Sequence, residues 1–161
     1  MVSEEFNVLE AIRLAQEAEQ KAAAFYDDAA QKVKHPLGQS LLKELAEFER
    51  HHYAKLVALE ESLRKRGAFI EYEGREMATK PPSPGEITVD RQPTQAMEVV
   101  ALALEAEQQA EKRYDTLAER TSDPVAHEMF RRLADEEHTH YRILRDVYWN
   151  LNNRRAWVWA V

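Results

Sequence analysis

The sequence predicts an all-α fold, an antiparallel four-helix bundle with one long crossover between its second and third helices. Only four Gly and six Pro occur in 161 residues, which leaves long stretches rich in helix-forming side chains. These helix breakers cluster at two short junctions and in one longer segment, so they divide the chain into four helical stretches. The chain also repeats: residues 14–56 and 102–144 align without a gap at an offset of 88, and 17 of the 43 aligned positions are identical.

The predicted helices are read from the positions of these breakers. The junction after the first helix contains Pro36 and Gly38, and the junction before the last contains Asp123, a suitable N-cap, followed by Pro124 at the first helical position. Both junctions are short, as antiparallel neighbouring helices require. The four predicted helices cover residues 4–33, 37–66, 94–121 and 124–150.

One domain is predicted over residues 1–161, because a chain of this length builds one sizeable core more readily than two. Residues 67–93 hold three of the four Gly and four of the six Pro, so they form a long crossover and not a hairpin. Residues 151–161 form a C-terminal tail. Trp149, Trp157 and Trp159 are expected to pack against the end of the bundle or against a neighbouring subunit.

Apolar residues recur every three or four positions along each predicted helix, as the core face of a bundle requires. Each apolar stripe is interrupted at one level. On the second and fourth helices the interruption is a Glu-x-x-His pair, and on the first and third it is a single Glu. The interrupting residues are Glu19, Glu49, His52, Glu107, Glu137 and His140.

Four carboxylates in one core would destabilise the domain strongly unless they were neutralised, because an unpaired buried charge costs several kcal/mol. Two divalent cations would balance the four carboxylates, and the two imidazoles add nitrogen donors. Since the chain has no Cys, a metal must be held by Glu, Asp and His. The i, i+3 spacing points both donors of a pair to one side of the helix. The sequence therefore predicts a site for two iron ions, with manganese as the alternative.

Over residues 5–150 the chain resembles the ferritin-like di-metal family, and within that family the rubrerythrin-type proteins. The resemblance lies in a Glu seven residues before a Tyr on the first and third helices, Glu19/Tyr26 and Glu107/Tyr114, followed by Glu-x-x-His on the second and fourth. It implies a ferritin-like bundle. It also implies that the two Tyr side chains are hydrogen-bond donors that orient the ligand carboxylates.

The same resemblance implies a role for each metal ligand. Glu49 and Glu137 would bridge the two metal ions. Glu19 and Glu107 would be terminal ligands, and the imidazole of each Glu-x-x-His pair would cap one metal.

By this resemblance we expect a di-iron oxidoreductase that reduces hydrogen peroxide or dioxygen in oxidative-stress defence. Rubrerythrins with an attached rubredoxin carry a Cys-ligated iron that supplies electrons, and this chain has no Cys. We therefore expect an external donor, a rubredoxin-like protein or a flavoprotein.

One departure from the rubrerythrin pattern favours a different activity. Rubrerythrin-type sites usually have a second Glu three residues from the first on the third helix, where this chain has Leu104 and Ala110 on either side of Glu107. The ligand set is thus closer to bacterioferritin-like centres. A ferroxidase or iron-storage protein that oxidises Fe(II) is the alternative prediction. A hydroxylase or desaturase and a bundle with a vestigial site are the remaining alternatives.

Composition and charge argue against some classes of binding partner and location. The net charge of −7 argues against general binding of nucleic acid or of an anionic membrane. No stretch of about 18 apolar residues is present for a membrane span, and residues 1–10 do not resemble a signal peptide. We expect a cytoplasmic protein. A homodimer is also expected, and the long crossover permits a helix-swapped one in which two chains share the ligands.

Other acidic and histidine residues are expected to face solvent. Asp135 and His138 share the spacing of the ligand pairs but lie off the apolar stripe, and their repeat counterparts do not form such a pair. Glu17 and Glu105 repeat, yet they lie on the opposite side of the helix from the ligand candidates. Neither pair is predicted to bind metal.

Overall fold

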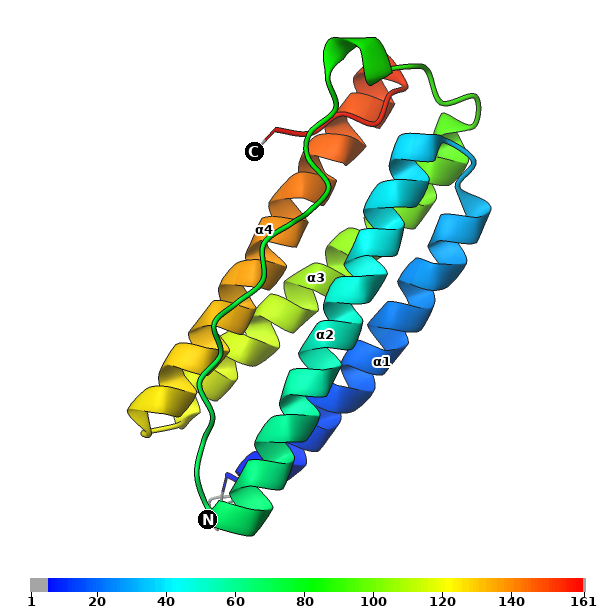
Figure 1. The fold of residues 1–161 in the computed structure, drawn as a ribbon. Coiled ribbons are helices and arrows are strands. Elements are labelled where there is room, and N and C mark those ends of the chain that lie inside the picture. Colours follow the sequence, from blue (N-terminus) through cyan, green and yellow to red (C-terminus); the bar gives the residue numbers. More distant parts are fainter. Residues whose placement is uncertain (1–5, 161) are drawn as a thin grey trace, which may run out of the picture.

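The computed structural model describes residues 6–160, and in these residues it contains four long helices and one short 3₁₀ turn (Figure 1). The prediction of an all-helical fold with four long helices is confirmed. Within residues 6–160 there is no β-strand, only an isolated bridge between Val89 and Ala156. No helix among them is sufficiently long and apolar for a membrane crossing. The elements are α1 (Val8–Lys32), α2 (Pro36–Arg66), η1 (Pro84–Glu86), α3 (Pro93–Arg120) and α4 (Pro124–Arg154).

Two helix ends lie four residues from their predicted positions, and four others differ by one residue. Helix α1 begins at Val8, because the Asn7 side chain accepts a hydrogen bond from the backbone N–H of Glu10, at 3.2 Å, and caps the helix there. Residues 4 and 5 of the predicted helix lie outside the described residues. Helix α4 runs to Arg154, four residues beyond its predicted end, and stops at Arg155 in a left-handed conformation with φ 57°. The first part of the predicted tail is therefore helical.

The helices pack as two pairs, α1 along α2 and α3 along α4, and the pairs approach each other through α1 and α3. Residues 67–92 connect α2 to α3, and we call this segment the strap. In Figure 1 the strap is the green trace that runs along the length of the bundle on the side of α2 and α4.

Hydrogen bonds between the strap and side chains of α2 and α4 hold the strap in place. The buried carboxylate of Glu44 on α2 accepts from the backbone N–H groups of Ala78 and Thr79, the latter at 2.6 Å. Arg132 on α4 donates to the backbone carbonyl of Glu73 at 2.9 Å. An extended segment with few backbone partners of its own is thereby fixed over the α2–α4 edge.

The tail packs on the end of the bundle, and most of its aromatic surface is buried there. Trp157 and Trp159 are 0% and 4% exposed, whereas Trp149 on α4 is 56% exposed. The Trp157 indole donates to Asp90 of the strap at 2.8 Å. The tail thus joins the end of the strap to the bundle core.

Two apolar clusters lie at opposite ends of the bundle. One contains Leu42, Leu45 and Trp157, and the other contains Leu56 and Met129. The level between them is occupied by the interrupting polar residues of the four stripes. The site is therefore enclosed on both sides by well-packed apolar core.

The contact between Trp157 and Gly38 generates a stability prediction. A Cβ added at Gly38 would lie 2.6 Å from a ring carbon of Trp157 and 2.7 Å from Cγ1 of Val33, and both neighbours are buried. Gly38→Ala is expected to lower the free energy of unfolding by about 1–3 kcal/mol, because overpacking forces the neighbours to move. Urea denaturation measures this change. Gly85→Ala is the control, since nothing lies within 4 Å of a Cβ there; equal stability of the two variants would contradict the expectation.

Candidate metal centre

The six predicted ligand residues lie together at the middle level of the bundle. Each is at most 2% exposed, and each helix contributes from its inner face. Helices α1 and α3 each contribute one Glu. Helices α2 and α4 each contribute a Glu and the His one turn later, which points to the same side. All six belong to a single chain in this structure.

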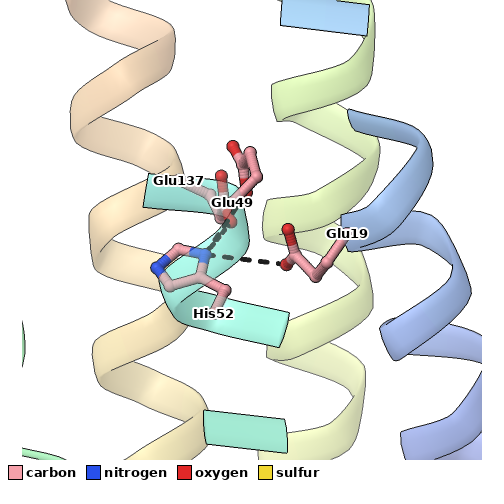
Figure 2. A group of neighbouring side chains, drawn as sticks. All are labelled: Glu19, Glu49, His52 and Glu137. Carbon is pink, nitrogen blue, oxygen red and sulfur yellow. Dashed lines mark ion pairs between the residues drawn. The ribbon is translucent and has the colours of Figure 1, made fainter. Parts of the chain in front are cut away.

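The ligand atoms form two overlapping groups, and within each group the atoms lie within 4.8 Å of one another. Figure 2 shows the first group, in which side chains from α1, α2 and α4 converge. Glu49 and Glu137 belong to both groups, so the two groups share two carboxylates. The first group is Glu19, Glu49, His52 and Glu137, and the second is Glu49, Glu107, Glu137 and His140.

In the first group, the Nδ1 atom of His52 faces the carboxylates. It lies 2.7 Å from Oε1 of Glu137, 3.4 Å from Oε2 of Glu49 and 3.6 Å from Oε1 of Glu19 (Figure 2). The second group has a similar arrangement around Nδ1 of His140, which lies 3.6 Å from Oε2 of Glu137 and 3.7 Å from a Glu107 oxygen. In both groups an imidazole nitrogen and carboxylate oxygens point at the same small volume.

The donor atoms suit a cation because most of them have no hydrogen-bond partner. Buried atoms without a partner are rare in proteins and call for an explanation such as an ion. Here they are oxygen and nitrogen atoms that point toward one another from four helices, which is the donor set that iron and manganese accept. The atoms are Oε2 of Glu49, Oε2 of Glu107, both carboxylate oxygens of Glu137, and Nδ1 of His52 and of His140.

Charge in this enclosed site shifts the pKa of each carboxyl group. Burial raises the pKa of Glu49 and of Glu137 well above the usual range, and the neighbouring carboxylates raise it further. Burial by itself would also raise the pKa of Glu19. Contacts with Glu49, His52 and Tyr114 outweigh burial and lower this pKa to about 2. Burial and like charge therefore favour the neutral form of the two shared carboxyls, whereas bound cations would favour the ionised form.

Tyr26 and Tyr114 each donate a hydrogen bond to a ligand carboxylate. Tyr26 on α1 donates to Glu107 on α3 at 2.5 Å, and Tyr114 on α3 donates to Glu19 on α1. Each Tyr therefore bonds to the Glu of the other repeat, and not to the Glu seven residues before it. Burial raises the pKa of both phenols well above 10, so both remain protonated donors.

Sequence reasoning missed Glu136, which contacts the outer nitrogen of His52, and the two residues that hold Glu136, Tyr72 and Arg75. The Nε2 atom of His52 lies 3.2 Å from Oε1 of Glu136, and the Glu136 carboxylate also accepts from the Tyr72 hydroxyl and from the backbone N–H of Arg75. Burial tends to raise the pKa of Glu136, but its bonds to His52, Tyr72 and Arg75 lower it overall. The repeat contained one signal of this residue. Glu136 aligns with Phe48, so one half of the site has a carboxylate where the other half has an aromatic ring.

The residues expected to face solvent do so. Glu17, Glu105 and Asp135 are exposed. His138 is also exposed and lies 3.1 Å from Glu111 on the outside of the bundle. None of the four belongs to the two metal-ligand groups among the described residues.

The sequence was also compared with models of known protein families. A family model described as Rubrerythrin matches residues 2–60 and 86–158. The chain belongs to the rubrerythrin family. The internal gap in the match, residues 61–85, covers the end of α2 and most of the strap. Members of this family bind iron, and the buried Glu/His cluster is suited to a metal.

A solved structure with a similar fold is that of a hypothetical protein from Pyrococcus furiosus. The two chains are 28% identical, each is covered over 92% of its length, and the TM-score is 0.71. No curated protein matches the sequence.

Removal of one buried carboxylate is expected to have opposite effects on two properties: it should preserve or raise the stability of the metal-free protein, and it should lower the metal content. Glu49→Gln replaces a buried acid by a neutral side chain of the same shape, so the metal-free protein is expected to unfold at the same or a higher temperature. The same change removes a shared ligand, so bound metal per chain should fall by at least half. Thermal unfolding and elemental analysis, each before and after chelation, measure the two effects.

Glu17→Gln is the matched control, because it makes the same change at an exposed position of α1. It should leave both metal content and unfolding temperature unchanged. Full metal content in Glu49→Gln would contradict the assignment of Glu49 as a shared ligand.

Proposed function

We propose that this protein is a di-iron oxidoreductase that reduces hydrogen peroxide or dioxygen with electrons from an external donor. The observation that carries the proposal is the pair of overlapping four-residue groups that share Glu49 and Glu137. Two iron ions bound there would supply two electrons at adjacent positions. Reduction of one peroxide consumes these two electrons and two protons and releases two water molecules.

In this proposal the chain's own residues bind the metal and exclude water. Glu19 and His52 would hold one metal ion, Glu107 and His140 would hold the other, and the shared carboxylates of Glu49 and Glu137 would contribute to both. The apolar clusters above and below this level keep bulk water away. Such a dry site strengthens each contact between carboxylate and cation.

A pocket between α1 and α3 supports access of a small oxidant to the site. The pocket has a volume of about 360 Å³ and is lined by Glu19, Glu49 and Glu107 together with Tyr26. Small side chains, including Ala22 and Ala110, form part of its wall. Peroxide and dioxygen are small enough for this pocket, and the Tyr26 hydroxyl lies beside it as a hydrogen-bond donor to Glu107.

The electron donor is proposed to be a separate molecule, a rubredoxin-like protein or a flavoprotein. The chain has no Cys, so it carries no thiolate-ligated iron of its own. The donor has to pass electrons through the wall of the bundle, because every ligand is at most 2% exposed.

Stopped-flow mixing tests this proposal. Protein loaded with Fe(II) under anaerobic conditions is expected to be oxidised by peroxide or dioxygen, with one peroxide consumed per two Fe(II). Glu49→Gln, loaded in the same way, should lose most of the rapid phase. Failure of both oxidants to oxidise the bound iron faster than free Fe(II) would contradict the proposal.

Iron oxidation for storage is the second candidate, and one feature of the ligand set favours it. Leu104 and Ala110 stand where a further Glu on α3 would enlarge the set beyond six. Excess Fe(II) added in air distinguishes the two functions. Retention of iron far above two ions per chain supports storage, and a ceiling near two supports the oxidoreductase.

A further inference from the structure

The two halves of the site are built from a sequence repeat, yet their histidines have different surroundings. His52 and His140 occupy equivalent positions at the offset of 88 residues. In each, Nδ1 faces the shared carboxylates. The difference lies on the opposite edge of each ring, away from the proposed metal positions.

The Nε2 edge of the His52 ring contacts the carboxylate of Glu136, and two residues of the strap hydrogen-bond to that carboxylate. Nε2 of His52 lies 3.2 Å from Oε1 of Glu136. The Tyr72 hydroxyl donates to both oxygens of Glu136, and the backbone N–H of Arg75 donates to Oε2 at 3.2 Å. Both partners belong to the strap, so the strap fixes Glu136 and Glu136 fixes the ring. A carboxylate acceptor requires that Nε2 carry the proton, which leaves the Nδ1 lone pair for a cation.

His140 has no such partner. The repeat places Phe48 where the other half has Glu136, and the Phe48 ring packs against the His140 ring with centroids 4.4 Å apart and planes at 78°. Among the described residues no hydrogen bond is made to either nitrogen of His140. A phenyl ring packs against the imidazole but does not accept a hydrogen bond as a carboxylate does, so Phe48 does not set the tautomer of His140 as Glu136 sets that of His52.

His140 also lies beside open space. A pocket of about 380 Å³ between the strap, α4 and the tail is lined by Phe48, Met77, Lys80, His140 and Trp159. His52 is not among the residues that line this pocket. The His140 side chain therefore has room on its outer edge, whereas the outer edge of His52 is covered by Glu136 and Tyr72.

We propose that Glu136 is a positioning residue which makes the two metal positions unequal, so that the position served by His52 binds a divalent cation more tightly than the position served by His140. A hydrogen-bonded carboxylate raises the basicity of a ligating imidazole and holds its orientation, and loss of such a partner costs about 10- to 100-fold in metal affinity. The position with the unsupported His140 is the one at which a metal exchanges more readily.

Zn²⁺ binding to the full chain tests this inference, because Zn²⁺ is inert to redox chemistry. The chelator-treated protein is titrated with Zn²⁺ in competition with a chromogenic chelator. Wild type is expected to bind two Zn²⁺ in two separate steps. Glu136→Gln should weaken the tighter step about 10- to 100-fold and leave the weaker step unchanged. Asp135→Asn is the control: it removes a charge one residue away, at an exposed position, and should change neither step.

A second readout reports on the ring itself. In the Zn²⁺-loaded protein, the Nε2–H proton of His52 is expected to give an NMR signal that is shifted downfield and exchanges slowly with water. Glu136→Gln should speed this exchange without changing the signals of His140. Should Glu136→Gln fail to fold, Tyr72→Phe, which removes one donor to Glu136, should give the same changes with smaller magnitude.

The inference rests on the metal site of the proposed function, and the titration separates the failure of each. Two Zn²⁺ bound with equal affinity in wild type, or a Glu136→Gln variant that weakens both steps equally, would overturn the inequality and leave the site standing. Wild type that binds no Zn²⁺ would overturn the metal site and the inference together.

Discussion

The structure depends on how four carboxylates are accommodated inside one helix bundle. Glu19, Glu49, Glu107 and Glu137 are each at most 2% exposed, and several of their oxygens have no hydrogen-bond partner. Ionised together they would repel one another in a region of low dielectric constant. Burial and this repulsion raise the pKa of the two shared carboxyls, Glu49 and Glu137, well above the usual range. Two divalent cations would balance the four carboxylate charges, so the fold and the proposed metal site share one electrostatic requirement.

The rest of the molecule keeps this polar level enclosed and oriented. Each Tyr donates across the bundle to the Glu of the other repeat, so the two repeats hold each other's ligands. The strap then adds a contact that the repeat does not supply, because Tyr72 and Arg75 position Glu136 against His52. A duplicated site has in this way become asymmetric through a segment that is outside the duplication.

Much of this arrangement was predictable from sequence because it follows helical periodicity. Stepping three and four residues along each helix brings Glu19 and Glu107 to the level of the Glu-x-x-His pairs, and the repeat supports that alignment. Which Glu each Tyr contacts was not predictable, since it depends on how α1 packs against α3. Glu136 was missed because its partners lie in the strap, and an extended segment carries no periodicity from which its contacts can be inferred.

Anomalous X-ray diffraction from crystals of the iron-loaded protein, recorded above and below the iron absorption edge, tests the central claim most directly. Two anomalous peaks per site are expected, both between Glu49 and Glu137, one beside Nδ1 of His52 and one beside Nδ1 of His140. A site without anomalous density between these carboxylates, or iron found only on the surface of the bundle, would contradict the account.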